Sequence, residues 1–212
     1  MQIALIGASG FIGSALRVEA LARGHQVRAI VSNPAKLAAA ANLDVRQVDV
    51  LDSHALAEAL SGVDAVISAF SGHAQVDVRG YYLQGVRSII DAVRSAGRPR
   101  LLMVGGAGSL EVAPGVQLVD TEAFPAAWKG TAEGARDALA LLRAESGLAW
   151  TMLSPSAHLQ PGQRTGRFRL GTDQLLVAAS GQSEVSVEDY AVAMIDELET
   201  PAHTGRRLTV GY

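Results

Sequence analysis

Three glycines near the amino terminus, Gly7, Gly10 and Gly13, follow one another at three-residue spacing. They come directly after the apolar run 3–6 and before a segment whose apolar residues have helical spacing. In dinucleotide-binding loops the first glycine allows a sharp turn, the second lets pyrophosphate approach, and the third lets helix and strand pack closely. The pattern therefore predicts a dinucleotide site, with a ligand-free glycine turn as the alternative. The residues expected to contact the cofactor are Gly7, Ser9, Gly10, Phe11, Ile12 and Gly13.

Around this loop the chain alternates short apolar runs with segments of helical spacing. Strands are expected at 3–6, 26–31, 45–48, 65–68, 100–104, 148–153 and 208–210, and helices at 12–23, 35–41, 53–60, 78–96, 131–145 and after Ser186. This alternation predicts an α/β fold of the Rossmann type, with a parallel sheet and helices on both faces. In such sheets ligands bind at the carboxyl ends of the strands.

We expect a single domain over residues 1–212, whose cofactor half covers about 1–105. A small C-terminal substrate-side elaboration is expected from the segments at about 106–130 and 155–185. The first of these segments interrupts the alternation, and a loop of that length in a compact domain usually carries function.

Composition narrows the classes of partner. The net charge is −3, so neither a nucleic-acid partner nor an acidic membrane surface is expected. The chain has no cysteine, which excludes disulfides and thiolate catalysis, and its histidines show no metal-ligand spacing, so no metal is expected. No apolar run approaches the roughly 20 residues of a membrane helix. Because Met1 leads almost directly into a strand, we expect no signal peptide and a cytoplasmic location.

Several segments together resemble one family. They are Gly7-Ala8-Ser9-Gly10, the stretch 104–110, the stretch 150–155, Arg164-Thr165-Gly166 and Glu188-Asp189-Tyr190-Ala191. The chain resembles the atypical branch of the short-chain dehydrogenase/reductase superfamily, and within it the NAD(P)H-binding proteins often labelled NADH-flavin reductases. These are similar to biliverdin-IXβ (flavin) reductase and, more distantly, to NmrA-like redox sensors. The resemblance covers nearly the whole chain and implies a nicotinamide dinucleotide cofactor.

The end of the second predicted strand bears on the choice of cofactor. NAD-specific sites place an acidic residue here for the ribose 2′-hydroxyl, and none stands between Arg28 and Pro34. The family commonly has an arginine at the position of Ser32, which this chain lacks. Ser32, Asn33 and Lys36 can still bond a 2′-phosphate, so NADP is expected, with NAD as the second choice. The alternative for the first two is an ordinary turn before the proline.

The resemblance assigns further cofactor contacts at the ends of later strands. Asp49 and Val50 match the position that touches adenine, although Asp49 can equally cap the next helix. The loop expected over the adenine ribose contains Ala69, Phe70 and Ser71, of which the phenylalanine can equally be core. Gly105 also lies in a shared motif, and Pro155 matches the proline that leads into the nicotinamide-side loop.

The usual catalytic pair of the superfamily, Tyr-x-x-x-Lys, is excluded by the sequence. The chain has two lysines, and the positions four before them are Ser32 and Pro125. The candidate catalytic residues are Ser109, Lys129 and His158. The serine falls where the superfamily has its catalytic hydroxyl, the lysine is expected inside the long loop, and the histidine can act as an acid near neutral pH. The alternatives are a loop hydroxyl bonded to backbone, a solvated lysine and a solvent-facing histidine.

These features favour an NAD(P)H-dependent reductase that passes hydride to a flat conjugated acceptor such as a flavin or quinone. A non-catalytic NAD(P)(H)-binding sensor of the NmrA type is the main alternative, because the usual proton donor is missing. A sugar epimerase or dehydratase is a weaker alternative, because such enzymes normally need the missing pair and a larger C-terminal domain. The sequence leaves the oligomeric state open.

Overall fold

The computed structural model describes residues 1–73 and 75–212. The described residues form an eight-stranded sheet in the order β10-β12-β8-β5-β4-β1-β2-β3. Its strands are β1 (Gln2–Ile6), β2 (Gln26–Val31), β3 (Leu43–Gln47), β4 (Ala65–Ser68), β5 (Arg100–Val104), β8 (Trp150–Ser154), β10 (Arg169–Gly171) and β12 (Arg206–Gly211). Neighbouring strands pair parallel, except that β10 pairs antiparallel with β12. The strand order reverses between β1 and β4, which creates the crevice where such sheets bind ligands.

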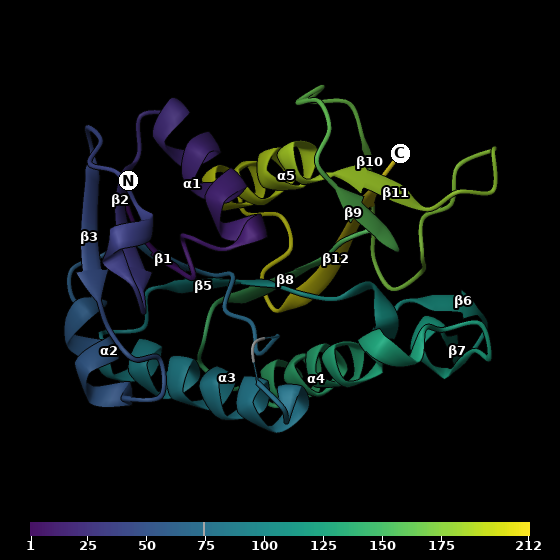
Figure 1. Ribbon diagram of the computed structural model, residues 1–212, viewed down its shortest axis with the longest axis horizontal. Helices are drawn as coiled ribbons and strands as arrows, with labels where there is room; N and C mark the ends of the chain where they lie inside the picture. The colour runs from purple at the N-terminus through teal and green to yellow at the C-terminus, as the bar shows by residue number, and fades with distance from the viewer. Residues whose placement is uncertain (74) are drawn as a thin grey trace.

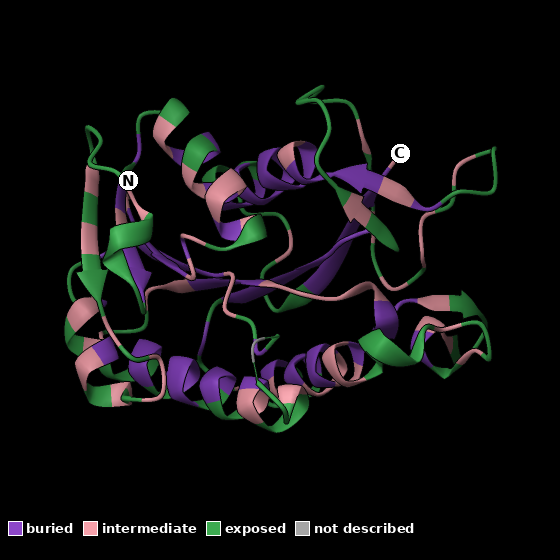
Figure 2. Ribbon diagram, in the orientation of Figure 1, coloured by how far each residue is buried: buried purple, intermediate pink, exposed green. Residues whose placement is uncertain are grey.

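Helices cover both faces of the sheet, so the predicted Rossmann-type architecture is confirmed. Figure 1 shows α1 (Phe11–Ala22) and α5 (Val187–Glu199) on one face, with α2 (Ser53–Ala59), α3 (Val78–Ser95) and α4 (Ala126–Arg143) on the other. Two apolar clusters fill the two layers between sheet and helices. In Figure 2 the central strands are buried, and β4 and β8 are buried at every position. Burial on both faces explains why these strands read as continuous apolar runs.

Local signals in the sequence set the helix boundaries. The side chains of Asp52, Asp77 and Ser186 accept hydrogen bonds from backbone N–H groups in the first turns of α2, α3 and α5. Beyond the ends of α1 and α3, Gly24 and Gly97 have φ of +81° and +93°, a conformation that glycine adopts without steric cost. The predicted strands 26–31, 65–68 and 100–104 match the structure at both ends.

Two predicted helices were wrong in extent. The segment 35–41 contains one turn of 3₁₀ helix, η1 (Pro34–Lys36), because its alanines are mostly exposed and have no core to pack against. Helix α4 begins at Ala126 rather than 131. Residues 126–129 are all exposed, so the apolar periodicity on which the prediction relied starts only after them.

The predicted loop 106–130 has structure of its own. It contains η2 (Ala107–Ser109), a hairpin of β6 (Glu111–Ala113) and β7 (Val116–Gln117), η3 (Leu118–Asp120) and the first turn of α4. Further along the chain, β9 (His158–Gln160) and β11 (Glu184–Ser186) form a small parallel pair next to the start of α5. These segments lie at one end of the sheet (Figure 1). In the part of the chain that the structure describes, no helix is long and apolar enough to cross a bilayer.

Candidate functional site

Two of the three loop glycines are explained by packing within the protein. A Cβ atom on Gly7, where φ is +77°, would lie 2.6 Å from the carbonyl oxygen of Ala69. A Cβ atom on Gly13 would lie 2.0 Å from the carbonyl oxygen of Gly7. These contacts bring the end of β1, the loop after β4 and the start of α1 together without room for a side chain.

Gly10 has a different environment. Its φ of −79° is open to any residue, and the nearest described atom to a Cβ placed there is the Gly7 carbonyl oxygen at 3.3 Å. Packing therefore gives little reason for glycine at this position, whereas the close approach of a pyrophosphate does. The predicted contact of Gly10 with the cofactor stays a prediction, and this openness supports it.

The start of α1 differs from those of α2, α3 and α5. Within the described residues no side chain caps α1, and its first turn contains no acidic residue. Its first N–H groups and the positive end of its dipole are therefore directed toward the crevice between β1 and β4 without a capping carboxylate or hydroxyl. Such a helix start suits an anionic group, and the pyrophosphate of a dinucleotide has the required charge.

The residues after β2 are exposed, as a contact to the adenosine end requires. Asn33 Oδ1 accepts a hydrogen bond from the Ala35 N–H at 3.0 Å, so the Asx turn that was left as an alternative is present. The Gln47 side chain donates to the Ser32 carbonyl at 3.1 Å. Three exposed residues beside the end of β2 have groups that can bond a 2′-phosphate. These groups are the Ser32 hydroxyl, the Asn33 amide nitrogen and the Lys36 ammonium.

The predicted adenine contacts are partly occupied within the protein. Asp49 Oδ1 accepts from the Leu51 N–H at 2.9 Å, and the Val50 carbonyl accepts from the Ser88 hydroxyl at 2.5 Å. The carboxylate of Asp49 therefore shapes the turn before α2 and is also exposed to solvent. Neither observation tests a contact with adenine, which stays a prediction.

Phe70 is packed mainly against α3. Its ring stacks on that of Tyr82 at a centroid distance of 6.0 Å, and a Cβ on Gly85 would lie 2.2 Å from it. The backbone of this loop is held at the crevice as well, because the Ala69 N–H donates to the Ile6 carbonyl at 2.9 Å. We therefore expect this loop to contact the cofactor through backbone and through the exposed Ser71, with the phenylalanine as its anchor.

The far side of the crevice is formed by the ends of β5 and β8. The Gly105 N–H and the Tyr190 hydroxyl both donate to the Leu153 carbonyl, at 2.8 and 2.7 Å. A Cβ on Gly105 would lie 2.8 Å from Met152 Cγ, so this glycine has a packing role. Pro155 follows β8 directly and is itself buried. The predicted cofactor contacts of Gly105 and Pro155 are untested.

The candidate catalytic residues lie on three separate elements. Ser109 in η2 is only 3% exposed, and its hydroxyl and carbonyl oxygens accept from Arg207 at 2.8 and 3.0 Å. Lys129 is in the first turn of α4 and not inside a loop, which corrects its predicted setting. His158 lies on β9, exposed, at a cavity of about 550 Å³ lined also by Glu184 and Gln182. Among the residues described, no hydrogen bond or ion pair joins any two of the three.

Two tyrosines lie close to the crevice, but neither is suited to proton transfer. Burial raises the pKa of Tyr82 to about 12. Burial also raises the pKa of Tyr190 well above its ordinary value, and its hydroxyl is bonded to a backbone carbonyl. These two tyrosines therefore do not replace the missing catalytic pair.

The sequence reading missed a group of polar residues that fastens the segment 161–166 to two helices. Asp189, fully buried, accepts from the N–H groups of Thr165 and Gly166, both at 2.8 Å, and from the Tyr212 hydroxyl at 2.8 Å. Burial opposes ionisation, but a hydrogen bond from the Thr165 hydroxyl, together with those just named, outweighs it and holds the pKa of Asp189 below its ordinary value. Two of the motif segments quoted above thus meet in space, and that shared membership was the available signal.

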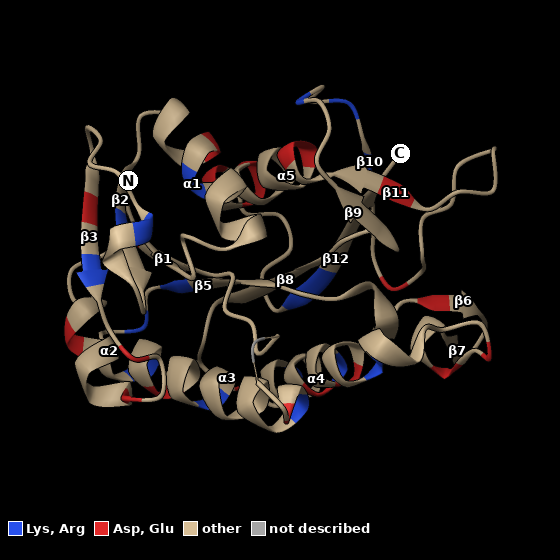
Figure 3. Ribbon diagram, viewed as in Figure 1, with Lys and Arg blue, Asp and Glu red and all other residues tan. Residues whose placement is uncertain are grey.

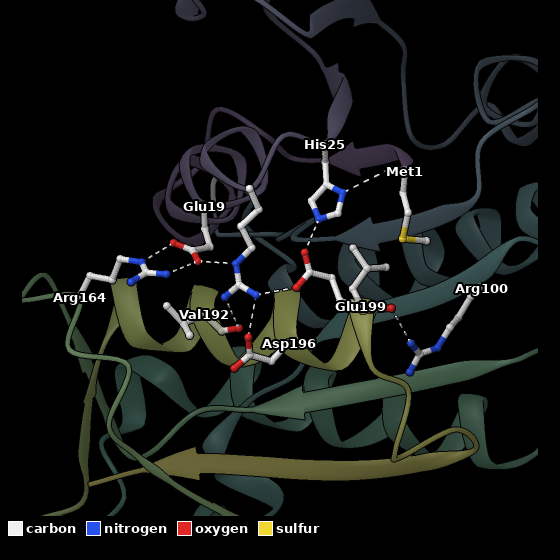
Figure 4. A network of polar contacts seen from close by, with 10 residues as sticks. Met1, Glu19, His25, Arg100, Arg164, Val192, Asp196 and Glu199 are labelled. Carbon is white, nitrogen blue, oxygen red and sulfur yellow. Dashed lines mark hydrogen bonds and ion pairs between the residues drawn. The ribbon is translucent and has the colours of Figure 1, made fainter.

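The same segment is bound to α1 through an ion pair. Arg164 donates to Glu19 at 2.7 and 2.8 Å, and Glu19 also pairs with Arg23 (Figure 4). The hydrogen bond from Arg164 is the main reason why the pKa of Glu19 is lowered, and it outweighs the opposing effect of burial. The pair joins residues 145 positions apart in sequence, so no local pattern predicts it.

Basic and acidic residues are interspersed along α3 and α4 (Figure 3). The charged residues of α5 are all acidic, namely Glu188, Asp189, Asp196, Glu197 and Glu199. Within residues 1–73 and 75–212, no group of three or more His, Asp or Glu side chains is arranged to hold a metal ion.

Comparison with known proteins agrees with this geometry. The model of the NAD(P)H-binding family matches residues 7–201. The chain is 39% identical to the uncharacterized protein YwnB of Bacillus subtilis over 213 residues, covering 99% of this chain and 98% of the other. A provisionally assigned epimerase of Bacteroides thetaiotaomicron is 45% identical, with a TM-score of 0.94 over 100% of this chain and 96% of that one.

A second solved structure is a provisionally assigned NADH-flavin reductase of Streptococcus pneumoniae. It is 34% identical, with a TM-score of 0.89 over 100% of this chain and 99% of that one. These relatives share the fold along its full length, and the family model spans the glycine loop, the crevice and the substrate-side segments. The chain therefore belongs to the NAD(P)H-binding family, with the Rossmann-like fold of atypical short-chain dehydrogenases.

Proposed function

We propose that the protein is an NAD(P)H-dependent reductase whose acceptor is flat and conjugated, such as a flavin or a quinone. Family membership supports the cofactor. The observation that carries the acceptor class is the absence of the Tyr-x-x-x-Lys pair, so no tyrosine activated by a lysine at that spacing supplies a proton, and Tyr82 and Tyr190 are buried. The likeness to a provisional NADH-flavin reductase points to the same acceptor class.

The choice of acceptor follows from where negative charge develops. A simple ketone becomes an alkoxide on reduction and needs a strong proton donor at once. A flavin or quinone spreads the charge over conjugated atoms, so protonation can come later and from a group that is not fixed at a single carbonyl oxygen, the position of the missing tyrosine. Bound NAD(P)H supplies the hydride, and the chain contributes binding and orientation. The uncapped start of α1 holds the pyrophosphate, and the loop anchored by Phe70 positions the ribose side.

We propose NADP(H) as the preferred cofactor, with NAD(H) as the second choice. Ser32, the amide of Asn33 and Lys36 are exposed at the end of β2, and no carboxylate stands between residues 28 and 34 to repel a 2′-phosphate. The reaction suits the cytoplasm, which we propose as its location, with the small-molecule acceptor as its partner and without a nucleic-acid or membrane partner.

A panel assay tests this function. NADPH oxidation is followed by absorbance with free flavins, quinones, ketones and sugars as acceptors. We expect turnover with flavins or quinones and little with ketones or sugars. Dominant ketone reduction would contradict the proposed acceptor class.

Two other functions would both leave NADPH unoxidised in this assay, and they differ in whether a sugar substrate is converted. A sensor of NAD(P)(H), favoured by the missing proton donor, would bind NADPH tightly and turn over none of the acceptors. An epimerase, suggested by the relative from Bacteroides thetaiotaomicron, would act on a sugar nucleotide without net consumption of cofactor. Such enzymes normally use the Tyr-x-x-x-Lys pair, and its absence speaks against this alternative.

A further inference from the structure

His73 is held between two side chains of α4. Its Nδ1 lies 3.2 Å from the hydroxyl oxygen of Thr131. The imidazole and the indole of Trp128 have centroids 5.9 Å apart and planes at 83°. Trp128 and Thr131 are three residues apart on one helix and thus share a face. The imidazole therefore has a defined orientation although it lies on an exposed loop.

The position of this group follows from the register of α3 and α4. Arg79, the second residue of α3, pairs with Glu133 and Asp137 in the middle of α4. Both helices connect parallel strands and run in the same direction, so residues 126–132 extend about 10 Å beyond the start of α3. His73 lies on the loop that leaves the carboxyl end of β4, and sheets of this kind bind their ligands at that edge.

The charged groups around the imidazole are mostly engaged elsewhere. Asp77 accepts from the Gly80 N–H at 2.8 Å, as the cap of α3. Arg79 and Glu133 pair with each other across α3 and α4. Lys129, exposed on the first turn of α4, follows Trp128 directly, whereas Arg136 lies farther along the helix and pairs with Asp120.

We propose that His73 is the proton donor of the reductase, with Thr131 and Trp128 as positioning residues. The inference rests on the proposed function, since it names the donor for the same acceptor. The acceptor takes two electrons with the hydride from NAD(P)H and becomes anionic. The Nε2–H bond of the imidazolium breaks, and the proton forms an O–H or N–H bond on the acceptor. The neutral imidazole then regains a proton from water, to which its loop is exposed.

The contact with Thr131 suits both states of the histidine. A hydroxyl accepts from Nδ1–H in the imidazolium and donates to Nδ1 in the neutral ring. In either state Nδ1 is occupied, so Nε2 is the nitrogen left to exchange a proton. The side chain type fits, because histidine is the residue most often used for proton transfer near neutral pH.

The test compares pH profiles of quinone reduction for His73→Gln, Thr131→Val and Thr131→Ser. General acids contribute roughly 100-fold or more, and water competes with this one, so we expect kcat of His73→Gln to fall by about tenfold. The pH-dependent limb of kcat should vanish, with NADPH affinity unchanged. Thr131→Val should lower kcat by several-fold, and Thr131→Ser should restore it, because serine keeps the hydroxyl.

Two histidines provide matched controls. His54→Gln changes an exposed histidine on α2 and should leave the profile unchanged. His158→Gln tests the other candidate acid. A wild-type pH profile in His73→Gln would overturn the assignment while leaving the reductase function intact, and loss of the limb only in His158→Gln would move the donor to β9. Absence of turnover in the wild-type protein would instead reject the proposed function, and this inference with it.

Discussion

The sharpest test of the cofactor site is the substitution Gly10→Glu. The backbone at Gly10 has φ of −79° and ψ of 176°, so a side chain needs no change of backbone conformation. A Cβ there meets the Gly7 carbonyl oxygen at 3.3 Å, a contact that a shift of a few tenths of an ångström relieves. We therefore expect the variant to fold with a stability close to that of the wild-type protein.

Binding should respond much more than stability. The new carboxylate would stand at the uncapped start of α1, where the pyrophosphate is expected, and would repel it while also satisfying the free N–H groups. We expect the NADPH dissociation constant to rise at least about tenfold, equivalent to about 1.4 kcal/mol. Isothermal titration calorimetry measures this constant, and thermal unfolding without cofactor measures stability.

Two further variants separate charge, size and packing. Gly10→Gln has the same size without the charge, so it should weaken binding less than glutamate does. Gly13→Ala would place a methyl group 2.0 Å from a backbone oxygen, and we expect it to lower the free energy of unfolding by about 1–3 kcal/mol. A folded Gly10→Glu protein that binds NADPH with wild-type affinity would refute the assignment of the pyrophosphate to this loop.

Three other predictions concern cofactor choice, stability and rate. Ser32→Asp should repel a 2′-phosphate and shift preference toward NADH in calorimetric titrations; a wild-type protein that clearly prefers NADH would show the proposed preference to be wrong. Asp189→Asn should cost about 1–3 kcal/mol, because a charged acceptor is lost. Since the folded pKa of Asp189 is lowered, this difference is present above the unfolded pKa and disappears as pH falls through the folded value, which urea unfolding at several pH values checks. Ser109→Ala should lower quinone reduction only modestly in steady-state assays, because its hydroxyl is already bonded to Arg207; a complete loss would contradict this reading.

Much of the fold could be predicted from the sequence because a strand buried on both faces consists of consecutive apolar residues. β4 is four consecutive buried residues, and the helices before and after it in the chain, α2 and α3, have Asp52 and Asp77 as caps. The first turn of α4 left no such trace, because its residues are exposed and its start depends on Pro125 and on neighbours distant in sequence. Apolar residues recur at helical spacing only where a helix packs against a core. A helical turn that extends beyond the core therefore cannot be predicted from this spacing.

The candidate site was predictable only in part, for a related reason. Gly7 and Gly13 follow from the geometry of a strand, turn and helix that are adjacent in sequence. The contact of His73 with Thr131 spans 58 positions, and that of Thr165 with Asp189 spans 24. Both contacts form only because the strands that lead to these residues end close together in the sheet. The order of the strands in the sheet depends on the whole chain and not on any one segment.

The two attachments of the segment 161–166 limit how this protein can be recombined with its relatives. Glu19 is 5% exposed, and without Arg164 it would keep Arg23 as its partner from α1. Loss of Arg164 would therefore leave this buried carboxylate with one cationic partner in place of two. A loop transplanted from a relative must therefore bring residues that match Glu19 and Asp189, or these must change with it. We therefore expect the segment 161–166 and helix α1 to be exchangeable between relatives only together.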